Sequence, residues 1–231
     1  MHLVLLAAFA FVGTHFLLSA STLRSVLVRG LGEAGFLGLY VVVAFATIGW
    51  LAYAYIAAPA EPLLWPVRDG AWTGVTVLML LASILLAGSL FGNPAMPDPT
   101  GSAIAVPAAT GVYAITRHPM MWAFALWGVA HIGVFPVASN IVVAAAVIVL
   151  ALVGSALQDR KKERFKPALW RDWEARTSYW PFAALLTGRR RWSETWPGWR
   201  ALLLGLAIWL AATWAHIPVS SWHAGIWKWI G

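Results

Sequence analysis

The sequence contains no cysteine. Disulfides, cysteine-ligated iron–sulfur clusters, thiolate catalysis and the C-x-x-C-H attachment of c-type haem are therefore excluded. Any metal has to be held by histidine, carboxylate or methionine side chains. Charged residues are also scarce, at 11% of 231 residues, whereas a soluble domain carries about a quarter. This shortage excludes an ordinary soluble protein.

Apolar sequence is abundant instead, since hydrophobic residues make up 61% of the chain. Apolar stretches of about 18 residues or more recur, and this is the length that crosses a lipid bilayer as a helix. We predict an all-α fold, a polytopic membrane helix bundle that forms a single integral membrane domain over residues 1–231. About six transmembrane helices are expected, at residues 2–22, 35–57, 72–91, 119–136, 138–157 and 200–217.

The net charge of +7 has a topological explanation. Nearly all of the sixteen lysines and arginines fall in the first, third and fifth connections between these spans. Because basic residues are retained on the cytoplasmic side, we expect both termini to be extracytoplasmic and residues 158–199 to form a cytoplasmic, amphipathic basic loop. The expected location is a bacterial inner membrane. The basic residues then face the bilayer surface, and no nucleic-acid partner is expected.

Residues 115–134 read ITRHPMMWAFALWGVAHIGV and place Arg117, His118 and His131 in an apolar run. Ionisable groups at membrane depth are costly, so they indicate a functional site. His118 precedes Pro119, and proline is favoured at the first position of a helix. The RHP segment is therefore either a simple helix start or an anion-binding helix N-terminus.

His15 and His131 are the other candidates, because each is embedded in apolar sequence, FVGTHFLLS and LWGVAHIGV. A buried neutral imidazole needs partners for its nitrogens. One interpretation is a core histidine bonded to a carbonyl group. The other is a pair of axial ligands to a haem between the first and fourth spans. His216, at the end of the last span, is expected to be an interface residue, and its membership of a site is left open.

Helix geometry decides part of this question. His118 and His131 are about 20 Å apart along one helix and about 140° apart around it, so they cannot ligate one metal together. A histidine pair must therefore combine one of them with a histidine elsewhere. By depth in the membrane, His15–His131 and His15–His118 are equally acceptable.

The motifs GTHFLLS, ITRHPMMWAFALWGVAHI and RTSYWPFAALLTGR resemble those of the NnrU family of membrane proteins. That family includes bacterial proteins linked to denitrification and nitric oxide metabolism, and the plant and cyanobacterial 15-cis-zeta-carotene isomerase. The resemblance implies a haem b whose iron is held by His15 and His131, with Arg117 and His118 close to the site. It also implies a function in nitric oxide metabolism, or in cis–trans isomerisation of a hydrophobic polyene such as a carotenoid. Here IGVFPVAS follows the AH dipeptide, so activity on zeta-carotene itself is not expected.

Two alternatives remain. The RHP start and the segment DRKKERFKPALWRDWEARTSYWP are also similar to membrane S-adenosylmethionine-dependent methyltransferases. That resemblance implies a cofactor site at Arg117, His118 and Glu163, although Met121 and Ala123 depart from its motif. The second alternative is a non-enzymatic assembly or regulatory membrane protein with structural histidines.

Overall fold

The computed structural model describes residues 1–95, 108–220 and 222–230, and every regular element within these ranges is a helix. In this part of the chain, five helices are long and apolar enough to cross a membrane, and α5 (Pro119–Val134) is a shorter apolar helix. The expected all-α membrane bundle is therefore confirmed. The five long helices are α1 (His2–Ser19), α2 (Ser21–Ile56), α3 (Asp69–Ser89), α6 (Ala138–Phe165) and α9 (Gly198–Ser220).

α2 begins far earlier than the expected residue 35. Its chain bends at Gly32, where φ is +72°, instead of opening into a loop. Glycine adopts positive φ at little cost because it has no Cβ. An ion pair of 2.7 Å between Arg24 and Glu33 spans the bend. The first connection, which was expected from its arginines, is thus largely helical.

α6 extends beyond the expected end at residue 157 and places Asp159 on a helix. Gln158 lies in this additional part of α6, and its side-chain amide donates to the carbonyl of Ala95 at 2.8 Å. The rest of the expected 158–199 loop is a series of short helices rather than one interfacial helix. They are α7 (Pro167–Arg176), α8 (Ala183–Leu186) and the 3₁₀ helix η1 (Trp192–Thr195).

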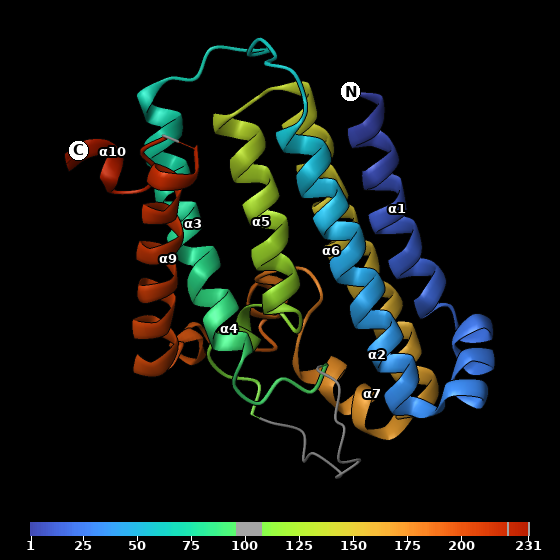
Figure 1. Cartoon of the computed structure of the whole chain (residues 1–231). Helices are drawn as coiled ribbons and strands as arrows, with labels where there is room; N and C mark the ends of the chain where they lie inside the picture. Colours follow the sequence, from blue (N-terminus) through green and yellow to red (C-terminus); the bar gives the residue numbers. More distant parts are fainter. Residues whose placement is uncertain (96–107, 221, 231) are drawn as a thin grey trace.

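α6 lies at the centre of the arrangement (Figure 1). The α1–α2 hairpin packs on one side of it and α5 packs on the other. α5 also packs against α3, and α3 packs against α9. The short helices α4 (Val112–Ile115), α7, α8 and η1 gather at one end of the bundle. We call this the basic end, because most lysines and arginines of the chain lie in the segments that form it.

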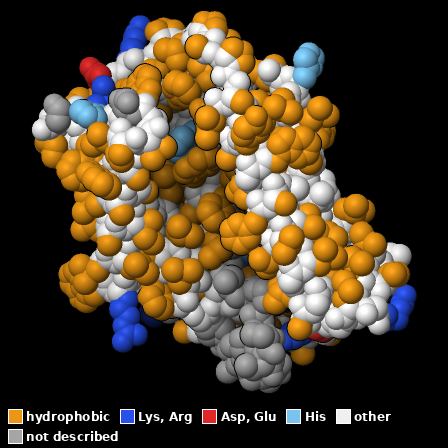
Figure 2. All heavy atoms as spheres, in the orientation of Figure 1, with side chains coloured by type: hydrophobic (Ala, Val, Ile, Leu, Met, Phe, Trp, Pro, Cys, Tyr) orange, Lys and Arg blue, Asp and Glu red, His pale blue; other side chains and the backbone are white. Residues whose placement is uncertain are grey.

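Figure 2 shows that the face between α2 and the α3–α9 side is hollowed. Hydrophobic side chains line this hollow, and a histidine side chain is visible in it. The hollow exists because α2 packs mainly on α1, and only slightly on α6. α2 is also the least buried of the candidate spans. The bundle therefore has an apolar opening on its side, at the height where α5 runs behind it.

Small residues set the distance between the helices. A Cβ at Gly205 of α9 would lie 2.7 Å from the Cα of Ile84 on α3, and a Cβ at Gly128 of α5 would lie 3.0 Å from the carbonyl oxygen of Ala144 on α6. Close approach of this kind is the usual way in which membrane helices associate.

Gly205→Ala tests the α3–α9 contact. We expect it to destabilise the bundle by about 1–3 kcal/mol, because the added methyl group meets backbone atoms that cannot move aside. Gly38→Ala is the matched control, since nothing lies within 4 Å of a Cβ at that helical position. Thermal unfolding in detergent measures both variants. Equal midpoints for the two would contradict the packing described.

Candidate functional site

The start of α5 is fixed by backbone contacts with a distant part of the chain. His118 is the N-cap of α5 and only 2% of its surface is exposed. The amide of Arg117 donates to the carbonyl of Ser178 at 2.8 Å, and the hydroxyl of Thr116 donates to the carbonyl of Tyr179 at 2.8 Å. The RHP segment is thus both a helix start and a docking point for the segment after α7.

Asp159 of α6 joins both ionisable residues of this segment. Its Oδ1 lies 2.6 Å from Nε2 of His118, and its Oδ2 accepts from Nε of Arg117 at 2.8 Å. The Arg117 guanidinium also contacts Glu174 of α7 at 3.0 Å. Asp159 is 5% exposed, so its carboxylate lies where little water reaches it. A charge in such a place is stable only when an oppositely charged group or a hydrogen-bond donor pairs with it. Sequence reasoning named Glu163 as the acidic residue of a possible cofactor site, and missed Asp159 and Glu174.

Aromatic side chains close the cluster. Trp170 and Trp173 of α7 are fully buried, and the ring of Trp170 lies 6.4 Å from that of His118. The ring of Tyr179 lies 5.7 Å from that of His118, and the guanidinium of Arg117 lies over the Tyr179 ring at 5.8 Å. The indoles of α7 therefore belong to the core.

The charged groups of the cluster partner one another, whereas Nε1 of Trp170 and Nε1 of Trp173 are buried without a hydrogen-bond partner among the described residues. Nε2 of His118 faces Asp159, and Arg117 faces two carboxylates. Burial raises the pKa of the Glu174 carboxyl, while Arg117 lowers it and Glu163 raises it further. The groups that an anion, a metal or a methyl-donor cofactor would need are already engaged. The arrangement is suited to holding the start of α5 against α6 and α7.

His131 has a different environment near the other end of α5. Its Nδ1 lies 2.8 Å from the carbonyl oxygen of Trp127, one turn earlier. A carbonyl oxygen only accepts hydrogen bonds, so Nδ1 carries the proton and the lone pair of the neutral ring is on Nε2. No described residue bonds that Nε2. The indole of Trp127 packs on the ring at 4.1 Å between centroids. His131 thus presents a free ligand atom with its orientation fixed.

His216 of α9 lies beside His131, with the ring centroids 6.1 Å apart. Its Nδ1 lies 2.7 Å from the carbonyl oxygen of Ala212, so its Nε2 is also unbonded within the described ranges. The sequence left His216 open, because its height on α9 relative to α5 depends on how the two helices pack.

His15 has the same local arrangement in another place. Its Nδ1 lies 2.6 Å from the carbonyl oxygen of Phe11, and its ring contacts Phe11 and Tyr40. α6 packs against both α1, which carries His15, and α5, which carries His131. In the described part of the chain, the ring contacts of His131 are with Trp127 and His216. The structure brings His131 together with His216 and places His15 elsewhere.

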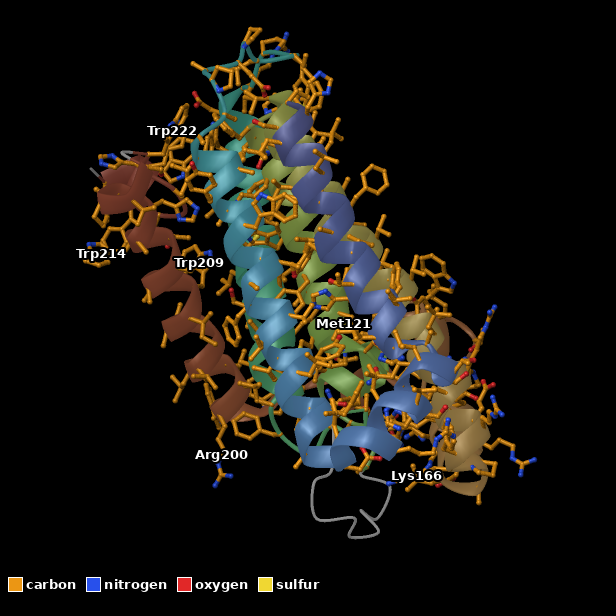
Figure 3. All side chains as sticks on the ribbon, turned by 45° about the vertical axis from the view of Figure 1, so that its right-hand side comes forward. Met121, Lys166, Arg200, Trp209, Trp214 and Trp222 are labelled. Atoms are coloured by element: carbon orange, nitrogen blue, oxygen red, sulfur yellow. The ribbon has the colours of Figure 1, made fainter. Side chains whose placement is uncertain are left out.

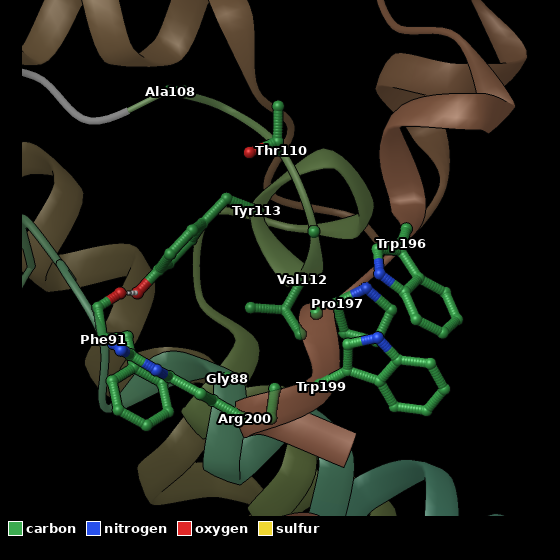
Figure 4. Close-up of a pocket in the computed structure, with 13 residues that line it drawn as sticks. Gly88, Phe91, Ala108, Thr110, Val112, Tyr113, Trp196, Pro197, Trp199 and Arg200 are labelled. Atoms are coloured by element: carbon green, nitrogen blue, oxygen red, sulfur yellow. Dashed lines mark hydrogen bonds between the residues drawn. The ribbon is translucent and has the colours of Figure 1, made fainter.

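A separate cavity of about 540 Å³ lies at the basic end, where α3 ends and α9 begins (Figure 4). Tyr113, Trp196, Trp199 and Arg200 are among the residues that line it. The hydroxyl of Tyr113 donates to the carbonyl of Phe91 at 3.0 Å. None of the site residues expected from the sequence is among the described residues that line this cavity.

Asp159→Ala tests whether the buried cluster holds α5 in place. We expect a loss of about 3–5 kcal/mol of stability, because His118 and Arg117 remain buried without that carboxylate. Asp172→Ala is the control: Asp172 is 53% exposed and pairs with Arg176 on the surface of α7. Exposed pairs of this kind contribute about 0–1 kcal/mol. Unfolding in detergent measures both, and comparable small losses would argue against the cluster as a support.

No curated protein and no solved structure matches the chain. A family model described as NnrU protein matches residues 3–223, which is nearly the whole length. The resemblance inferred from the three spaced motifs is thereby confirmed, and the chain belongs to the NnrU family.

Proposed function

We propose that this NnrU protein is an integral membrane protein that binds haem b, and that His131 would hold the iron. The observation that carries the proposal is the free Nε2 of His131 in an apolar helix. Ligating histidines usually donate their other ring N–H to a carbonyl or carboxylate, which fixes the ring and its tautomer. His131 does so through Trp127 at 2.8 Å.

The residues present fit a haem. The rings of His131 and His216 adjoin, His15 has the same free Nε2, and hydrophobic side chains line the hollow of Figure 2. Helix bundles commonly build cofactor sites from side chains that face one another in the core. Bound haem would supply redox chemistry, and its iron would accept a small ligand or a π-electron donor where one histidine is displaced. The family resemblance assigns the second ligand to His15.

The apolar opening supports a ligand that arrives through the bilayer. Nitric oxide and a polyene such as a carotenoid both dissolve in hydrocarbon, and both match the activities of the family. Trp127 would hold the His131 ring in place and the surrounding apolar side chains would keep water away. We further propose that the basic end faces the cytoplasm of a bacterial inner membrane, because basic residues are retained on that side.

The methyltransferase alternative receives less support. It needs Arg117 and His118 to receive the cofactor, and both are bonded to Asp159. Glu163, its expected acidic residue, is exposed on α6. A purely structural role for the histidines is tested by the same experiment as haem binding.

Absorption spectra of detergent-purified protein, expressed with adequate haem, test the proposal. We expect a Soret band that shifts on reduction. His131→Ala is expected to lose the six-coordinate signature, because an axial nitrogen is removed. His2→Ala is the control, since His2 is exposed at the start of α1. Failure of the reduced protein to form a nitrosyl spectrum on addition of nitric oxide would contradict the nitric oxide branch.

Absence of any Soret band from well-folded protein would contradict the proposal. A spectrum unchanged in His131→Ala would show that haem binds elsewhere in the molecule.

A further inference from the structure

We propose that the cavity at the basic end, between the end of α3 and the start of α9, binds the headgroup of an acidic phospholipid (Figure 4). Its volume of about 540 Å³ lies within the range of small-molecule sites in proteins, which is about 300–1,000 Å³. No histidine is among the described residues that line it, so the site is separate from the proposed haem site.

Arg200 supplies a positive charge to this cavity. It is the one charged residue among the described residues of the lining. The acidic residue closest to it in the sequence, Glu194, contacts Arg190 and Arg191 instead, at 3.7 Å each. In the described part of the chain, no carboxylate pairs with Arg200. A guanidinium group binds phosphate oxygens through two parallel hydrogen bonds, so a phosphate is the partner that fits it.

Two tryptophans border the opening of the cavity. Trp196 and Trp199 both line it, are 56% and 69% exposed, and meet edge to face with their ring centroids 5.3 Å apart. Tryptophan is enriched where a membrane meets water, because its ring is apolar and its N–H is polar. Figure 3 shows the side chain of Arg200 at the start of α9, extending away from the helices at the same end. The opening therefore lies at the depth of lipid headgroups.

Much of the cavity wall is apolar, which favours a lipid over a soluble anion. Val112 and Ala201 are buried in it, and Phe91 is 45% exposed just after the end of α3. An inorganic anion gains nothing from apolar surface. A phospholipid carries hydrocarbon directly beside its phosphate, so it can cover this surface while the phosphate meets Arg200.

The charge of the lining favours an acidic headgroup over a zwitterionic one. No aspartate or glutamate is among the described residues that line the cavity. A choline or ethanolamine headgroup would bring its own cation close to Arg200, with no carboxylate there to offset the repulsion. An acidic headgroup adds no cation. Basic pockets between membrane helices on the cytoplasmic side are suited to headgroups of this kind.

Lipid titration of the full-length protein in detergent tests the site. Phosphatidylglycerol is expected to raise the unfolding midpoint and to stay bound in native mass spectrometry, because a ligand of the native state stabilises it. Phosphatidylcholine with the same acyl chains is expected to do neither, and nor is inorganic phosphate. Arg200→Gln is expected to weaken the binding of phosphatidylglycerol about fivefold, the usual contribution of one arginine near a lipid surface.

Arg171→Gln is the matched control, since Arg171 is exposed on α7 and the change in charge is the same. It is expected to bind phosphatidylglycerol as tightly as the parent protein. Equal weakening in both variants would overturn the proposal, because overall charge would then explain the binding. Equal effects of the two lipids would overturn the choice of an acidic headgroup, and an equal effect of inorganic phosphate would overturn the choice of a lipid. These measurements need no haem, so the proposed function stands or falls separately.

The absence of cysteine from the chain allows a second test, of position. Thr110→Cys places a thiol in the lining of the cavity, and Ser193→Cys places one on the exposed surface of η1, outside the lining. Phosphatidylglycerol is expected to slow alkylation of the first thiol severalfold more than that of the second. Equal slowing of the two thiols would show that the headgroup does not enter the cavity.

Discussion

The carboxylate of Asp159 is the contact on which the placement of α5 depends. It binds two consecutive residues, Arg117 and His118, at the point where that helix begins. A helix is stiff over sixteen residues, so fixing its start against α6 also fixes the position and rotation of its far end. The ring of His131 therefore owes its place beside α9 to a charge cluster at the other end of the same helix. The ionisable residues at the start of α5 thus hold the helix in place, and His131 near its far end takes no part in that contact.

Much of the fold could be predicted from the sequence because it depends on local properties. Apolar runs gave the number and approximate positions of the spans, and Pro119 marked the start of α5 correctly. The acidic partner of His118 could not be found in this way, since Asp159 lies 41 residues further along the chain. Its only local signal is an acidic residue directly before the basic run RKK, at the end of an apolar stretch.

The bend in α2 and the pairing of His131 with His216 escaped prediction for related reasons. Arginines in the segment before Gly32 indicated a connection, yet glycine can bend a helix without ending it. The height of His216 relative to His131 depends on the packing of α9 against α3 and on that of α3 against α5. Packing registers of this kind arise from the fit of many side chains and leave no periodic mark in the sequence.

The weak attachment of α2 has a consequence for how the lateral hollow is bounded. α2 packs mainly on α1, and its other faces carry exposed apolar side chains such as Phe45 and Tyr53. In a membrane these faces meet acyl chains, so lipid completes the wall that protein leaves open. The composition and fluidity of the surrounding bilayer then determine what fills the hollow. Detergent replaces that wall, so the surroundings of the hollow in micelles differ from those in native lipid.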